Sequence, residues 1–92
     1  MITLHIEHEI TDFGVWHRAY SSFADHRRQA GVLAERIGRP ADDERYVVIG
    51  LDFGTSAEAG RFLEFLTTQV WTDPSRSPAL AGQPRSRILE VV

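Results

Sequence analysis

The chain has 92 residues, of which 42% are hydrophobic and 25% charged, and its formal net charge is −3. This length predicts one domain spanning residues 1–92, and the composition is that of a globular protein rather than a disordered one. The acidic balance argues against a nucleic-acid partner, which would need a basic face. Cysteine and lysine are both absent, which excludes disulfides, thiolate chemistry and lysine Schiff bases.

The first predicted element is a half-buried strand over residues 2–10, because apolar and polar residues alternate there. His8 falls on the apolar side of this strand. Asp12 is a good N-cap for a helix that runs to about Gln29. An aromatic stripe at helical spacing supports this helix, and Arg27-Arg28 is interpreted as its solvated end. The stripe consists of Phe13, Trp16, Tyr20 and Phe23.

Two further strands are predicted next, a weak one over 32–39 and a clear one over 45–53. The polar turn 40–44 between them indicates a hairpin. In the clear strand, Val47, Ile49, Leu51 and Phe53 alternate with a second set, Tyr46, Val48, Gly50 and Asp52. These two strands would therefore pair as neighbours in one sheet.

The last third of the chain predicts a second helix, a loop and a final strand. Thr55-Ser56-Ala57-Glu58 is a capping box that starts the helix, whose apolar face continues to Val70. Residues 72–84 contain three prolines and a glycine, so they are predicted to form a long loop. The final strand is then expected over 85–92. Trp71, between helix and loop, could pack across a dimer or cover a pocket.

This order of elements is that of the ferredoxin-like split βαβ plan. It predicts an α+β fold, βαββαβ, with a four-stranded antiparallel sheet and two helices on one face. The other face is left bare and needs a partner or ligand. A second copy is the simplest partner, so we expect a homodimer formed through this sheet face. The side chains expected there are Thr3, His5, Glu7, Tyr46, Val48, Gly50 and Asp52.

The segment His8–Trp16 carries the pattern His-x-φ-x-Asp-aromatic-x-x-Trp. With this pattern the chain resembles the dimeric α/β-barrel superfamily, which includes antibiotic-biosynthesis monooxygenase-type proteins. Agreement continues through Asp42-Asp43, the strand 46–53, the helix 57–66 and residues 81–84, so it covers nearly the whole chain. The most similar members are small, stand-alone and mostly uncharacterised.

The resemblance implies that two chains pack their sheets into an α/β barrel. It also implies a pocket between sheet and helices in each subunit, often for a flat apolar or aromatic molecule. Cofactor-free oxygenases of this group typically use an Asn and a Trp, and the related haem-degrading enzymes use an Asn, a Trp and a His. This chain has Trp16 and four His but no Asn, so it departs from both patterns.

Two histidines are candidate catalytic bases. His8 would act in a pocket walled by Trp16 and Tyr20, both predicted to bind ligand. The alternative, which we favour, is a buried structural His8 that is satisfied by Asp12 or by a backbone carbonyl. A histidine in such surroundings changes charge with small changes of environment.

His5 is expected on the bare sheet face with Glu7, Tyr46 and Asp52, which are further candidate ligand-binding residues. There His5 could act as a general base near carboxylates. The favoured alternative is a polar dimer interior with ordered water and hydrogen bonds between subunits. We expect neither a metal site nor a cofactor.

No apolar run approaches the length that crosses a membrane, and the N-terminus lacks the features of a signal peptide. We therefore expect a soluble cytoplasmic protein. The predicted function is that of a small homodimeric ligand-binding or accessory protein for an apolar or aromatic molecule. The alternative is a cofactor-free enzyme, such as a cyclase, isomerase or monooxygenase, that acts on polyketide-like or aromatic substrates.

Overall fold

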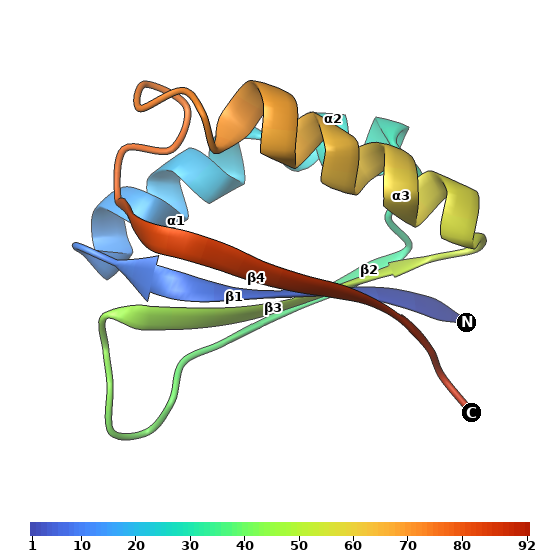
Figure 1. Cartoon of the computed structure of the whole chain (residues 1–92), viewed down its shortest axis with the longest axis horizontal. Coiled ribbons are helices and arrows are strands. Elements are labelled where there is room, and N and C mark those ends of the chain that lie inside the picture. The colour runs from blue at the N-terminus through green and yellow to red at the C-terminus, as the bar shows by residue number, and fades with distance from the viewer.

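A four-stranded antiparallel sheet forms the base of the protein, and all of its helices lie on one face of that sheet (Figure 1). The computed structural model describes residues 1–92. The strand order is β2-β3-β1-β4, so the first strand of the chain lies inside the sheet. This is the α+β architecture that the sequence predicts. The strands are β1 Ile2–Ile10, β2 Ala34–Gly38, β3 Tyr46–Phe53 and β4 Leu80–Glu90.

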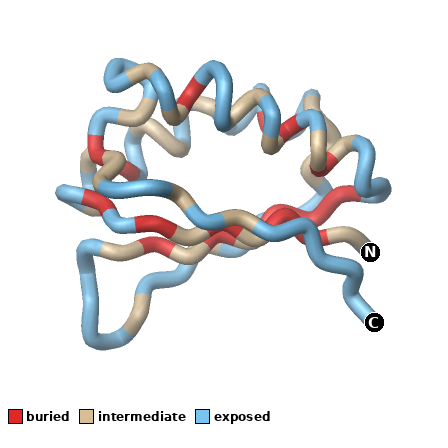
Figure 2. Tube along the Cα trace, viewed as in Figure 1, coloured by how far each residue is buried: buried red, intermediate tan, exposed pale blue.

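The hydrophobic core lies between the helices and the two central strands, where buried residues follow one another along the chain trace (Figure 2). Alternation in β1 and β3 sends every second side chain into this core. Its sheet side consists of Leu4, Ile6, Ile10, Val47, Ile49, Leu51 and Phe53. The opposite sheet face carries no helix, as predicted. None of the helices combines the length and apolar character that a membrane crossing requires.

The helices are α1 Phe13–Ser22, α2 Ala24–Gln29, α3 Ser56–Phe65 and the π-helix η1 Leu66–Val70. Both predicted N-caps are confirmed. An Asp12 carboxylate oxygen accepts the Val15 N–H at 2.9 Å, and the Thr55 hydroxyl accepts the Glu58 N–H at 3.2 Å. These bonds satisfy backbone donors that the first turn of a helix otherwise leaves unpaired.

The single first helix predicted to Gln29 is in fact two helices, α1 and α2. At Phe23 the backbone leaves helical geometry, with φ −96° and ψ 11°. The Phe23 ring packs edge-on against Phe65 of α3, with ring centroids 6.2 Å apart. Sequence spacing alone misses this break because the aromatic stripe continues through it.

The predicted boundary between the long loop and the last strand is wrong. β4 begins at Leu80 instead of residue 85 and includes Gly82 and Pro84. As an edge strand, β4 tolerates the missing N–H of proline. In the pairing of β4 with β1, Ala81 faces Glu9 and Arg85 faces Glu7. These two pairs are two residues apart in β1 but four residues apart in β4. The additional residues of β4 form a bulge opposite His8, and Gly82 in this bulge has a φ of 72°.

Candidate functional site

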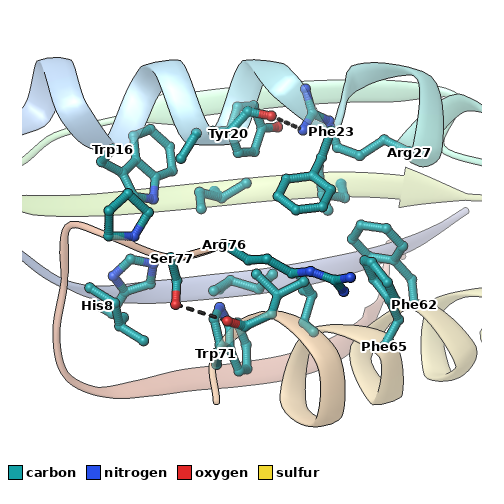
Figure 3. Close-up of a pocket in the computed structure, with 18 residues that line it drawn as sticks. His8, Trp16, Tyr20, Phe23, Arg27, Phe62, Phe65, Trp71, Arg76 and Ser77 are labelled. Atoms are coloured by element: carbon teal, nitrogen blue, oxygen red, sulfur yellow. Dashed lines mark hydrogen bonds between the residues drawn. The ribbon is translucent and has the colours of Figure 1, made fainter. Parts of the chain in front are cut away.

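A pocket of about 70 Å³ lies between the inner face of the sheet and the helices, with residues 71–80 along one side. Of its 18 lining residues, 13 are hydrophobic, so its walls favour an apolar occupant. Both layers of the fold contribute to it: α1 lies on one side of the pocket, α3 and η1 lie on the other, and β1 and β3 form its floor (Figure 3). Residues at its walls include Ile6, His8, Trp16, Tyr20, Phe23, Phe62, Phe65 and Trp71.

His8 is the histidine that borders this pocket, and only 4% of its surface is exposed. Its Nδ1 donates a hydrogen bond to the Glu9 carbonyl oxygen at 2.9 Å. The carbonyl can only accept, so the proton is on Nδ1 in the neutral ring, and Nε2 is left as an acceptor. Burial lowers the pKa of His8, and this effect outweighs the hydrogen bond to the Glu9 carbonyl, which raises the pKa. The predicted backbone-carbonyl anchor is thus confirmed, while Asp12 caps α1 instead.

Trp16 and Tyr20 form the aromatic wall on the α1 side. Their rings stack with centroids 5.0 Å apart and planes inclined by 25°. One helical turn separates them in sequence, which places both on the same face of α1. Trp16 also meets His8 edge-on at 6.4 Å. The three predicted residues His8, Trp16 and Tyr20 are therefore brought together at one pocket.

Tyr20 is held in place by a cation that sequence reasoning missed. Arg27, predicted to be solvated, is only 4% exposed, and its guanidinium carbon lies 3.7 Å from the centre of the Tyr20 ring. Its Nε donates to the Glu35 carboxylate at 3.0 Å, and Nη1 donates to the Tyr20 carbonyl. Burial raises the pKa of the Tyr20 hydroxyl. The partner Glu35 is on β2, so no local pattern could reveal this ion pair.

The outer face of the sheet carries the other predicted residues, all of them away from the pocket. Glu7 accepts hydrogen bonds from the Tyr46 hydroxyl at 2.7 Å and from His5 Nε2 at 2.8 Å. These bonds, His5 first and Tyr46 second, lower the pKa of Glu7. The Glu7 hydrogen bond in turn raises the pKa of Tyr46.

A second network on this face surrounds Asp52. Arg36 binds both Asp52 carboxylate oxygens, at 2.9 and 3.0 Å, and the Thr3 hydroxyl donates at 2.7 Å. The Arg36 bonds first, and then Thr3, lower the pKa of Asp52 to about 2. Its partners within the chain therefore keep this carboxylate ionised. No cluster of three or more histidine or acidic side chains is arranged to hold a metal ion.

The segment after η1 completes the pocket. Trp71 lines it, and whether this residue also packs across a dimer stays a prediction. Arg76 lines it as well, and Ser77 is fixed to the Val70 carbonyl by a 2.8 Å hydrogen bond. Asp73 accepts the N–H and the hydroxyl of Ser75 at 2.9 and 2.7 Å, which organises the turn. These residues were predicted only as a loop.

Comparison with known proteins identifies the fold. No family model and no curated protein sequence matches the chain. Among solved structures, an antibiotic biosynthesis monooxygenase is 14% identical, with a TM-score of 0.70 over 100% of this chain and 99% of the other. A dimeric ferredoxin-like protein from an uncultured marine organism is 13% identical, with a TM-score of 0.71 over 99% and 94% of the two chains.

A third similar structure is an uncharacterised NIPSNAP domain protein from Burkholderia xenovorans. It is 14% identical, with a TM-score of 0.67 over 100% of this chain and 95% of the other. Identities this low show a shared fold and nothing about chemistry. The chain therefore has the ferredoxin-like fold of antibiotic biosynthesis monooxygenase-like proteins, as its sequence resemblance predicts.

Proposed function

We propose that the protein is a homodimer that binds a small apolar or aromatic molecule in the pocket between its sheet and its helices. The observation that carries the proposal is the pocket itself, with 13 hydrophobic residues among 18 and an aromatic wall of Trp16 and Tyr20. An apolar cavity on the order of 150 Å³ takes up a benzene molecule. The cavity of about 70 Å³ is smaller than this, so even a ligand of one ring would require its walls to move apart.

His8 offers a hydrogen-bond acceptor to a polar group on that ligand. Its Nε2 is an acceptor without a hydrogen-bond partner in the chain, because Nδ1 is committed to the Glu9 carbonyl. A ligand hydroxyl or N–H that donates to Nε2 would be favoured in these apolar surroundings. Toluene and phenol differ by such a hydroxyl, so their relative affinities report on His8.

The bare sheet face supports the homodimer. His5, Tyr46 and Val48 on this face are only half-buried in the single chain. Two of the solved structures with this fold are described as dimeric ferredoxin-like proteins. We propose that two copies of this chain likewise pack outer face to outer face, with the Glu7 and Asp52 networks at the junction.

A catalytic role is the second candidate, and the state of His8 favours it. A neutral imidazole with a lowered pKa, fixed through Nδ1 and bordering an apolar pocket, can accept a proton from a bound substrate. Isomerisation or cyclisation of an aromatic or polyketide-like molecule would need such a base. If a candidate substrate is converted, His8→Gln should reduce turnover by about 100-fold.

Ligand binding can be tested by nuclear magnetic resonance with toluene, phenol and indole as added molecules. The indole N–H signals of Trp16 and Trp71 should shift in a saturable way, since both residues line the pocket. Ala19→Leu should abolish these shifts because Ala19 also lines the pocket and the larger side chain fills it. Ala24→Leu, at an exposed position of α2, is the matched control. Unchanged Trp signals with all three molecules would contradict the proposal.

A further inference from the structure

Arg76 is an unusual residue to find at the wall of an apolar pocket. In Figure 3 its side chain extends across the pocket toward Phe62 and Phe65, while His8 and Trp16 lie at the other end. About half of the Arg76 side chain is exposed, so the guanidinium is within reach of both solvent and pocket. A charged group in this position must find a partner or remain partly hydrated.

The partners that the chain itself supplies to Arg76 are weak. Nη1 donates to the Gln69 carbonyl at 3.3 Å, near the upper limit of a hydrogen bond. Nε lies 3.7 Å from an Asp73 carboxylate oxygen, too far for a hydrogen bond. Asp73 does not depend on this contact, because Ser75 already donates two hydrogen bonds to it. Most of the five N–H donors of Arg76 are therefore available to another molecule.

The charged residues that line the pocket all have one sign. Two arginines, Arg27 and Arg76, line it, and no aspartate or glutamate does, although the chain as a whole carries a net charge of −3. Arg27 is buried and already paired with Glu35 at 3.0 Å. Arg76 can therefore pair with an anion while the Arg27–Glu35 ion pair stays intact.

We infer that the ligand of this pocket is a small carboxylate, whose apolar ring lies among the aromatic side chains of the pocket and whose carboxylate pairs with Arg76. The inference rests on the proposed binding function and adds the charge of the ligand to it. The planar guanidinium can hold a carboxylate through two parallel hydrogen bonds. The nearby aromatic rings would strengthen this pair by excluding water.

Benzoate and benzyl alcohol test this inference, because the two molecules share one ring and differ in charge. Calorimetric titration at neutral pH should show benzoate binding about tenfold more tightly. Arg76→Gln should reduce benzoate affinity to that of benzyl alcohol and leave benzyl alcohol itself unchanged. Arg76→Lys should retain part of the preference, since it keeps the charge but loses the two-pronged geometry.

Arg61→Gln is the matched control, because it removes the same charge from an exposed position of α3 that does not line this pocket. Equal affinities for benzoate and benzyl alcohol, or equal losses in the Arg76→Gln and Arg61→Gln variants, would overturn the inference while leaving the binding function intact. If neither molecule binds the wild-type protein, the proposed function fails together with the inference.

Discussion

His8 lies edge-on to Trp16, with ring centroids 6.4 Å apart and planes inclined by 68°. The two residues belong to different elements, β1 and α1, and the Asp12 cap fixes the turn that joins those elements. The His8–Trp16 contact therefore links the sheet to the first helix at the pocket. It also keeps the imidazole in surroundings that disfavour its charged form.

The stability of the protein should depend on pH through His8. Burial lowers the pKa of this residue from 6.5, so the unfolded chain takes up the proton at a higher pH than the folded chain. The free energy of unfolding is then largest above pH 6.5 and decreases as the pH falls through that value. Urea unfolding of wild type and His8→Gln between about pH 5 and pH 7.5 measures this slope. It should be smaller in the variant, whereas the exposed His17→Gln should retain the wild-type slope.

Asp52 should stabilise the folded chain in a different pH range. Its pKa is lowered from 3.8 to about 2. Its contribution to the free energy of unfolding is therefore full above pH 3.8 and is lost as the pH falls toward 2. Asp52→Asn should reduce the free energy of unfolding at neutral pH by about 1–2 kcal/mol, less than a buried ion pair would, because Arg36 is largely exposed. Asp42→Asn, in the exposed turn, is the control. Equal effects of the two variants would contradict the role assigned to Asp52.

The bulge in β4 should depend on Gly82. With a φ of 72°, this residue adopts a conformation that alanine disfavours, although a Cβ there would meet no other atom within 4 Å. Gly82→Ala should therefore reduce the free energy of unfolding by about 1 kcal/mol through backbone strain alone. Gly38→Ala in β2 meets no atom either and has no such φ, so it should have little effect. Thermal unfolding of the two variants would show the difference.

Homodimer formation should be sensitive to Val48, which lies on the outer face beside Glu7 in the paired strand. Val48→Arg should weaken self-association on the order of 100-fold by placing like charges across a two-fold axis. Glu7 would offset the new charge within one chain, so circular dichroism should remain unchanged. Light scattering should report the mass of one chain for Val48→Arg and of two chains for Thr67→Glu, a control on η1. A wild-type protein that is monomeric at micromolar concentration would refute the homodimer.

Local patterns were enough to predict the faces of the sheet. Val47, Ile49 and Leu51 recur at every second position and are all buried, and the alternation of a strand is a property of adjacent residues. The same reasoning placed His8 on the inner face and His5 on the outer one. The N-caps at Asp12 and Thr55 are local as well, which explains why both were predicted correctly.

Features that depend on distant partners could not be predicted in this way. Arg27 is buried because Glu35 on another element accepts its hydrogen bonds. The start of β4 at Leu80 depends on pairing with Ile10, seventy residues earlier in the chain, and this pairing outweighs the loop-like composition of residues 80–84. Arg76 lines the pocket together with residues of α1 and α3, an arrangement that no local sequence pattern indicates.

The pairing of β1 also determines when this protein can fold. Ile2 pairs with Phe53 on one side and with Glu90 on the other, so the central strand is completed by residues from the far end of the chain. During synthesis, β1 cannot complete its pairing until β4 has left the ribosome. Topologies dominated by such distant pairings fold in milliseconds to seconds, more slowly than helical bundles of similar size. Until β4 arrives, one edge of β1 is open to strands of other molecules, so aggregation during expression should decrease when the chain concentration is low.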